Sequence, residues 1–130
     1  MFRNNCFIEN FIYIAIKILI ILINSIFWTM KSLQTIDLSQ NQIQIIFEKA
    51  FDGLESIEKI DLRDNLITNI YHRSFHGLYK LRLLYLERNR FETIQNDWVK
   101  ELLEPEYDLI SIFITDNPLV CDCDMNYVGK

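Results

Sequence analysis

The sequence of 130 residues has few of the residues that build common catalytic and cofactor sites. It contains three glycines, two histidines and three cysteines, and no glycine-rich phosphate loop is present. His72 and His76 are four residues apart, but no third ligand follows at the spacing of a metal motif. Ser74 lies between them without a pattern that indicates a base and a nucleophile. We therefore expect no enzymatic activity, no cofactor and no metal.

Positive charge is also scarce. Lysine and arginine total 13 against 18 acidic residues, which gives a net charge of −5, and no basic stripe is present. This balance argues against a nucleic-acid partner. No Asn-x-Ser/Thr sequence occurs, so no glycosylation signal indicates a compartment. The expected partner is another protein, whose identity the sequence does not give.

The chain does have a repeated pattern, LxxLxLxxNxI, which occurs four times. The first three copies are spaced by 24 residues, and the fourth follows 28 residues after the third. A period in this range indicates a repeat architecture. The asparagines of the four copies are Asn41, Asn65, Asn89 and Asn117.

The spacing within each copy has a physical explanation. Leu84 and Leu86 alternate with Tyr85, as a short strand with one buried face requires. The asparagine amide has donors and acceptors that can satisfy backbone groups where the chain bends. A second element, Phe-x-Gly-Leu, occurs at residues 51–54 and again 24 residues later at 75–78. One repeat buries too little apolar surface to fold alone, so stability must come from stacking.

These motifs resemble the leucine-rich repeat family, in the 24-residue class common among secreted and cell-surface proteins. The resemblance implies an α/β solenoid with a parallel β-sheet on its concave face. Loops, 3-10 turns and a short helix are expected on the convex side. It covers residues 33–119, as repeats 33–56, 57–80, 81–108 and a partial repeat 109–119. It also implies protein binding, as in the ectodomains of adhesion and Toll-type receptors.

The four additional residues of the third repeat predict a short helix. Asp97 is the expected N-cap, and Trp98, Leu102 and Leu103 share one helical face. Pro105 ends the helix. Trp98 is expected to be part of the core, with a role in binding as the alternative.

Stacking of the strands predicts columns of outward side chains on the concave face. Arg63 is expected beside Glu87, and Arg88 between Asp64 and Asp116, as lateral ion pairs. The apolar residues of the columns are candidate partner contacts; the alternative is a patch covered by a C-terminal cap. These candidates are Leu83, Tyr85 and Phe113, and the two columns that contain them are Thr35, Lys59, Leu83, Ser111 and Asp37, Asp61, Tyr85, Phe113.

The N-terminal segment, residues 1–28, is predicted to be a signal peptide or signal anchor. Its apolar run, 11–28, follows a weakly basic start, and Ser25 marks a possible cleavage point. The run is near the lower limit for crossing a bilayer. Lys17 opposes an anchor, since a lysine at the membrane centre costs about 2.5–3.5 kcal/mol. Both alternatives place the repeats in the secretory pathway, outside the cell or at its surface. The membrane is contacted only if residues 11–28 stay uncleaved.

Residues 117–130 resemble the start of the cysteine-rich C-terminal cap found in extracellular members of this family. In that family the two cysteines of the Cys-x-Cys motif pair with two later cysteines, but no cysteine follows Cys123. Cys121 and Cys123 are therefore candidates for an intermolecular disulfide. A zinc site is the alternative, and it lacks two ligands. The alternative interpretation of the whole chain is a truncated fragment or remnant of a larger leucine-rich repeat receptor, without independent activity.

Overall fold

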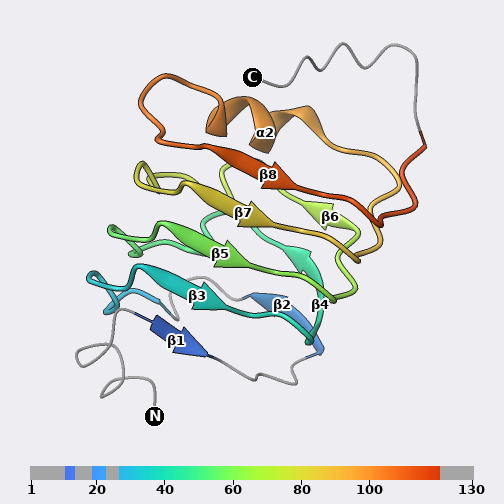
Figure 1. Ribbon diagram of the computed structural model, residues 1–130, viewed down its shortest axis with the longest axis horizontal. Helices are drawn as coiled ribbons and strands as arrows, with labels where there is room; N and C mark the ends of the chain where they lie inside the picture. Colours follow the sequence, from blue (N-terminus) through green and yellow to red (C-terminus); the bar gives the residue numbers. More distant parts are fainter. Residues whose placement is uncertain (1–10, 14–18, 23–26, 121–130) are drawn as a thin grey trace.

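The computed structural model describes residues 11–13, 19–22 and 27–120. These residues form short strands and one helix, α2, Asn96–Leu102, arranged in successive layers (Figure 1). The strands are β1 (Phe11–Tyr13), β2 (Leu19–Leu22), β3 (Thr35–Asp37), β4 (Gln42–Ile46), β5 (Lys59–Asp61), β6 (Asn69–Ile70), β7 (Leu83–Tyr85) and β8 (Ser111–Phe113). The result is an α/β repeat fold with little helix.

The first sheet contains one strand from each repeat, in the order β1-β3-β5-β7-β8, and its pairs are parallel. Thr35 pairs with Lys59, and Lys59 with Leu83, so each step along the sheet is one 24-residue period. The last step pairs Leu83 with Ser111, 28 residues later. The columns expected from the sequence are therefore confirmed.

A second, three-stranded parallel sheet in the order β2-β4-β6 was not predicted. Strand β4 follows the bend at Asn41, and its exposed Gln42 and Gln44 alternate with apolar Ile43. This alternation is a strand pattern. The chain then returns through separate turns, such as the one closed by Ala50 N–H and Phe47 O at 3.2 Å. This bond joins residues three apart, which is the spacing of a single 3-10 turn, and no 3-10 helix occurs within residues 27–120.

The core contains a continuous row of aromatic rings that crosses the repeats, stacked from Phe27 to Phe75 and edge-to-face between Phe75 and Trp98. The centroid distances are 5.9 Å from Phe27 to Phe51, 5.5 Å from Phe51 to Phe75, and 5.9 Å from Phe75 to Trp98. All four side chains are buried. Trp98 thus replaces the repeat phenylalanine in the irregular third repeat, and its predicted core role is confirmed.

Helix α2 begins two positions earlier than expected from its capping. Gln95 is the N-cap, with extended backbone and no side-chain capping bond, so the prediction of Asp97 as the N-cap was wrong. Asp97 lies in the first turn, where its negative charge interacts favourably with the positive end of the helix dipole. The helix buries Trp98 and Leu102, two of the three residues predicted to share its inner face, and Leu103 is half-buried.

The predicted signal segment contains strands β1 and β2, which pair with the repeats. Phe11 pairs with Thr35 at the repeat period of 24 residues, and Leu19 pairs with Gln42. Phe27 precedes Phe51 by the same period. Among the residues described, no helix is long and apolar enough to cross a membrane. Whether residues 1–28 are cleaved stays a prediction. Cys121 and Cys123 lie outside the described residues.

Candidate functional site

The four asparagines form a ladder of side-chain hydrogen bonds that positions the strands. The Nδ2 group of Asn65 donates to Leu62 O in its own repeat at 3.0 Å and to Leu38 O in the preceding repeat at 2.9 Å. Its Oδ1 accepts from Ile43 N–H at 3.1 Å. Asn89 and Asn117 repeat this arrangement. Asn41 donates to Leu38 O, while its Oδ1 has no partner in the described part of the chain. The ladder is therefore structural.

The candidate contact residues lie on the outer face of the first sheet, which we define by residues 35, 37, 39 and 40 and their equivalents in later repeats. Tyr85 and Phe113 are stacked, with ring centroids 4.8 Å apart and planes at 8°. Phe113 is 38% exposed, whereas Tyr85 and Leu83 are half-buried. The structure therefore brings Tyr85 and Phe113 together as one aromatic pair, and Leu83 lies two residues before Tyr85 on the same face of β7.

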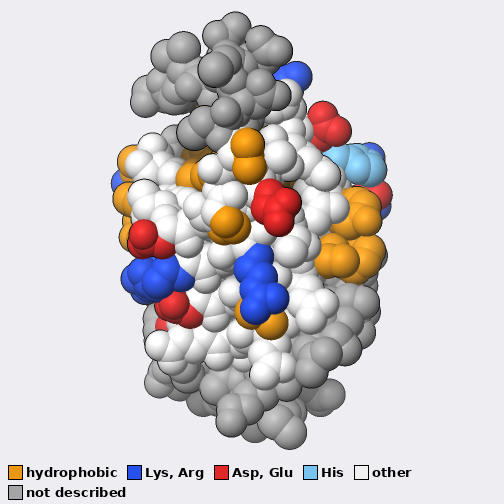
Figure 2. Space-filling model, turned by 90° about the vertical axis from the view of Figure 1, so that its right-hand side faces the viewer, with side chains coloured by type: hydrophobic (Ala, Val, Ile, Leu, Met, Phe, Trp, Pro, Cys, Tyr) orange, Lys and Arg blue, Asp and Glu red, His pale blue; other side chains and the backbone are white. Residues whose placement is uncertain are grey.

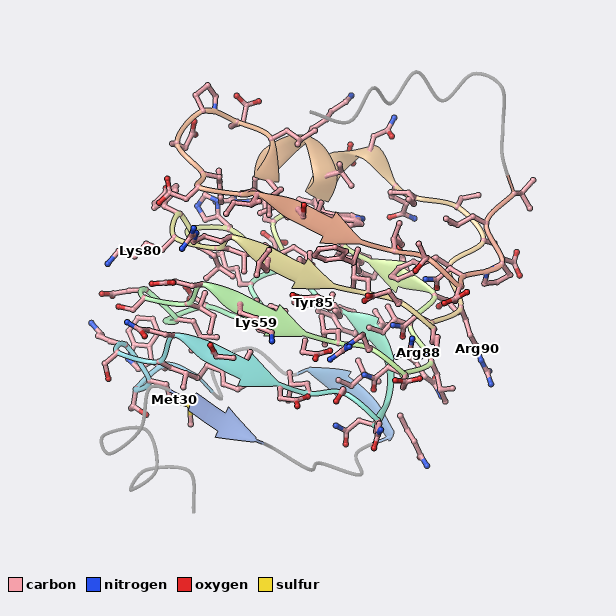
Figure 3. All side chains as sticks on the ribbon, viewed as in Figure 1. Met30, Lys59, Lys80, Tyr85, Arg88 and Arg90 are labelled. Carbon is pink, nitrogen blue, oxygen red and sulfur yellow. The ribbon has the colours of Figure 1, made fainter. Side chains whose placement is uncertain are left out.

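Two cations flank the ring of Tyr85. The Lys59 Nζ atom lies 5.1 Å from the ring centroid, and the guanidinium carbon of Arg63 lies 5.2 Å from it. Figure 3 shows Lys59 and Tyr85 on neighbouring strands of the first sheet. Both distances are within the range of a cation–π interaction. Sequence reasoning missed these contacts, although the diagonal positions of the columns contain the necessary signal.

Arg63 does not form the predicted ion pair with Glu87. Its guanidinium instead binds both carboxylate oxygens of Asp61, with Nε 2.9 Å from Oδ1 and 3.1 Å from Oδ2. The side chain of Asp61 is 4% exposed. A buried carboxylate needs a charge-assisted bidentate partner, and Asp61 lies two residues away on the same face. Hydrogen bonding to Asp61 raises the pKa of Arg63, so the guanidinium stays charged.

Arg88 forms one of the two expected lateral ion pairs. Its Nε and Nη2 lie 2.7 Å and 3.0 Å from the carboxylate oxygens of Asp64, while no hydrogen bond joins it to Asp116 within the described residues. Hydrogen bonding to Arg88 lowers the pKa of Asp64 below its ordinary value of 3.8. Figure 2 shows basic side chains between acidic ones at one edge of the molecule. The Arg88–Asp64 pair is at least partly exposed, and its two charges neutralise each other.

The residues before the ladder asparagines have left-handed backbone. The φ angles are 56°, 56°, 55° and 58° for Gln40, Asp64, Arg88 and Asp116. This conformation is uncommon for residues other than glycine. Sequence reasoning placed the bend at the asparagine and did not identify the left-handed backbone of the residue before it.

The two histidines and Ser74 have structural partners. His76 Nδ1 lies 2.7 Å from Glu101 Oε1 and links the second repeat to helix α2, while His72 Nε2 lies 3.6 Å from Glu48. Ser74 Oγ is buried and donates to Tyr71 O at 2.7 Å. Within the described residues, no group of three His, Cys, Asp or Glu side chains could hold a metal ion. Each of the three side chains therefore has a partner within the described residues.

Other aromatic pairs lie outside the outer face of the first sheet. Phe47 and Tyr71 stack at 5.1 Å, with Tyr71 39% exposed, and Tyr79 and Tyr107 lie 5.1 Å apart. Hydrophobic side chains also gather beside a histidine at one edge of Figure 2. The sequence analysis did not identify these pairs, because their residues are not part of the strand pattern.

The repeat pattern, the parallel sheet and the asparagine ladder agree with the family comparison. The sequence model described as Leucine rich repeat matches residues 22–67 and 57–104, which together are more than half of the chain. The chain belongs to the leucine-rich repeat family. No curated protein matches it at a significant level.

Leucine-rich repeats generally mediate protein–protein interaction and are typically non-catalytic. The first match begins at Leu22, the last residue of β2, and therefore includes Phe27 and Met30. These two residues precede Phe51 and Leu54 by 24 positions each. The family pattern thus extends upstream of Leu33, where the sequence analysis placed the first repeat.

Proposed function

We propose that this protein is a non-catalytic interaction module that binds a protein partner on the outer face of the first sheet. In this proposal the repeats form a solenoid, and the outer face is its concave surface. The observation that carries the proposal is the aromatic pair of half-buried Tyr85 and exposed Phe113, stacked at 4.8 Å, with Lys59 and Arg63 beside the Tyr85 ring.

An aromatic pair in this environment has the properties of a binding hot spot. Exposed aromatic groups surrounded by charged residues are enriched at protein interfaces. The pair is held by paired strands, and Tyr85 is also held between cations and Phe113, so binding loses little side-chain freedom. Leu83 extends the apolar surface on the same strand.

A photocrosslinking residue at position 85 tests the proposed surface. Tyr85→p-benzoylphenylalanine should crosslink a discrete protein from cells that express the full chain. The same substitution at Tyr71 is the matched control, because Tyr71 also stacks on another ring and lies outside the first sheet. Crosslinking at position 71 that equals crosslinking at position 85 would contradict the assignment of the binding face.

Paired substitutions provide a second test. Tyr85→Ser with Phe113→Ser should abolish recovery of the crosslinked partner, whereas Phe47→Ser with Tyr71→Ser should leave it unchanged. Circular dichroism and thermal unfolding of both variants separate loss of binding from loss of fold. Unchanged binding by a folded Tyr85 and Phe113 variant would exclude this pair as the contact.

We further propose that the protein enters the secretory pathway and acts outside the cell or at its surface. The apolar run at 11–28 supports this proposal. Cleavage at Ser25 would remove β1 and β2 and leave β3 and β4 as edge strands. Mass spectrometry of the N-terminus is the test: a start near Ile26 supports a signal peptide, and an intact Met1 in membranes supports an anchor. An intact Met1 in the cytosolic fraction would contradict both.

A further inference from the structure

The two ends of the repeat array differ in how well their core residues are covered. In the last repeat, the core residues Ile112 and Ile114 are only partly buried. The equivalent residues of the first repeat, Ile36 and Leu38, are 0% and 1% exposed. Each repeat contacts only its neighbours, so full burial of a repeat core requires a further layer stacked on it. The first repeat has such a layer in the segment that precedes it.

Strands β1 and β2 form this covering layer. Strand β1 pairs with β3, and β2 pairs with β4, so each of the two sheets ends on a strand from the upstream segment (Figure 1). Hydrolysis of the Ser25–Ile26 peptide bond, which the proposed signal peptide requires, separates both strands from the repeats. Strands β3 and β4 then become the edges of their sheets, and the core of the first repeat loses its cover.

This layer fits the first repeat less well than one repeat fits another. Within the repeats, Oδ1 of Asn65 accepts the N–H of Ile43 in the preceding repeat. Leu19 is the residue 24 positions before Ile43, but the pairing of β2 with β4 shifts by one residue and places Leu19 opposite Gln42. The buried Oδ1 of Asn41 has no partner in the described part of the chain. One of the bonds that join neighbouring repeats is thus missing here, which makes the covering layer easier to release.

The edge beneath the covering layer is almost free of charge. Strand β4 reads Gln-Ile-Gln-Ile-Ile, and its exposed side chains are Gln42 and Gln44. The equivalent positions of the third repeat are Arg90 and Glu92. Natural edge strands often carry a charged residue that keeps other chains from pairing with them. Strand β4 has no such residue, so another strand can pair with it without burying a charge.

The side chains of β4 suit a contact between two identical chains. A symmetric contact brings residues near the two-fold axis opposite their own equivalents, so these residues must be self-complementary. A glutamine amide both donates and accepts hydrogen bonds, whereas charged residues in this place would repel each other. An antiparallel pair of β4 strands centred on Gln44 places Gln44 opposite its own copy and Ile43 opposite Ile45. A second copy of the chain therefore matches this edge.

We propose that removal of residues 1–25 uncovers an interface at which the protein binds a second copy of itself through β4. The second copy takes the place of β2, and each chain covers the first-repeat core of the other. This inference rests on the proposed secretory processing, and a chain that keeps residues 1–25 stays monomeric. Tyr85 lies in the other sheet, so the proposed binding face stays accessible in the dimer.

The test makes the cut on the folded full chain. A recognition sequence for a specific protease is inserted between Ser25 and Ile26, and light scattering after size-exclusion chromatography gives the mass before and after cleavage. We expect a monomer before cleavage and a dimer after it. A dimer before cleavage, or a folded monomer after it, overturns the proposal. A cut chain that aggregates, keeps the 1–25 fragment bound, or binds phosphatidylcholine vesicles in place of a second copy also overturns it.

Substitutions at position 44 locate the interface. Gln44→Lys puts two lysines opposite each other at the two-fold axis and should raise the dissociation constant of the dimer at least about tenfold. Gln44→Glu should have the same effect, and an equimolar mixture of the two cut variants should restore a mixed dimer. Thr68→Lys is the matched control, because Thr68 is exposed at the same position one repeat farther from the edge.

The control variant should dimerise like the unmodified cut chain, and circular dichroism before cleavage shows that each variant is folded. A dimer that persists in Gln44→Lys, or a mixture of the lysine and glutamate variants that stays monomeric, overturns β4 as the contact. Equal weakening by Gln44→Lys and Thr68→Lys overturns it as well, because added charge alone would then explain the loss.

The processing and the interface can fail separately. If the secreted protein begins near Ile26 and the cut chain stays monomeric, the secretory proposal stands and the interface is overturned. If Met1 is intact in the cytosolic fraction and the cut chain dimerises, the interface stands and the secretory proposal is overturned.

Discussion

The side-chain amide of Asn65 donates a hydrogen bond to the carbonyl oxygen of Leu38, 27 residues earlier, at 2.9 Å. This bond joins one repeat to the preceding one. The Oδ1 atom of Asn65 makes a second link between the same two repeats, because it accepts a hydrogen bond from the N–H of Ile43. Asn65 is 4% exposed, so water cannot replace these bonds. The ladder asparagine therefore has two functions, closing its own bend and fixing the register between neighbouring repeats.

Asn65→Ala should lower the free energy of unfolding by about 2–4 kcal/mol. Leu38 O keeps its bond from Asn41, so the main penalty is a buried Ile43 N–H without an acceptor. Asn117→Ala is the matched control, because Asn117 makes equivalent bonds but is only partly buried. It should lose less than about 1.5 kcal/mol. Urea unfolding of both variants measures the difference, and equal losses would mean that burial of the ladder is unimportant.

Gly53→Ala should destabilise the fold more than Gly77→Ala. Both glycines have positive φ, 95° and 79°, so alanine at either position is strained by about 1–2 kcal/mol. A Cβ atom added at Gly53 would also lie 2.7 Å from the Cα atom of Trp28. A Cβ atom added at Gly77 would have no neighbouring atom within 4 Å. This clash should add about 1–3 kcal/mol. Thermal unfolding provides the comparison, and a lower melting temperature for Gly77→Ala would show that residues 27–28 can shift freely.

The strand register of the first sheet could be predicted because it follows directly from the period of the sequence. The asparagine positions and the core role of Trp98 followed from the same spacing. The spacing did not predict the partner of Arg63. Two carboxylates are within its reach: that of its lateral neighbour Glu87 and that of Asp61, two residues earlier. Burial of Asp61 decides between them, and burial depends on the neighbouring strands, which sequence spacing does not describe.

The second sheet and the upstream repeat were missed for different reasons. Strand β6 is two residues long, too short for a periodic signal. The upstream segment was interpreted as a signal segment because of its apolar composition. The repeat positions Phe27 and Met30 were therefore not recognised. The ladder position itself, 24 residues before Asn41, is Lys17, so the most specific marker of a repeat is missing there.

Asp64 should contribute to acid stability. Hydrogen bonding to Arg88 lowers its pKa in the folded protein, so the contribution is present above the ordinary value of 3.8 and is lost as pH falls below it. Asp64→Asn should therefore reduce the decrease in melting temperature between pH 5 and about pH 2, with little effect on the slope above pH 5. Asp108→Asn is a control for loss of one exposed carboxylate. The same acid slope in the Asp64 and Asp108 variants would show that the Arg88 pair has no special role.

Tyr107 should ionise late. Burial, followed by the charge of Glu101, raises its pKa to about 12, and its hydroxyl lies 3.2 Å from Glu101 Oε1 and 3.3 Å from Gly77 N. A folded-state pKa above the ordinary value of 10.0 means that the neutral phenol stabilises the fold below about pH 10. This contribution is lost as pH rises from 10 to 12.

Absorbance at 295 nm should show a late ionisation that Tyr107→Phe removes and that Tyr79→Phe leaves in place. The Tyr107→Phe variant should also keep more of its neutral-pH stability at pH 11 than the unmodified protein. Tyr79 is the suitable control, since it is the ring partner of Tyr107 and is 48% exposed. A late step that survives Tyr107→Phe would show that another tyrosine is the buried one. It would also remove the link between the hydroxyl, Glu101 of helix α2 and the turn at Gly77.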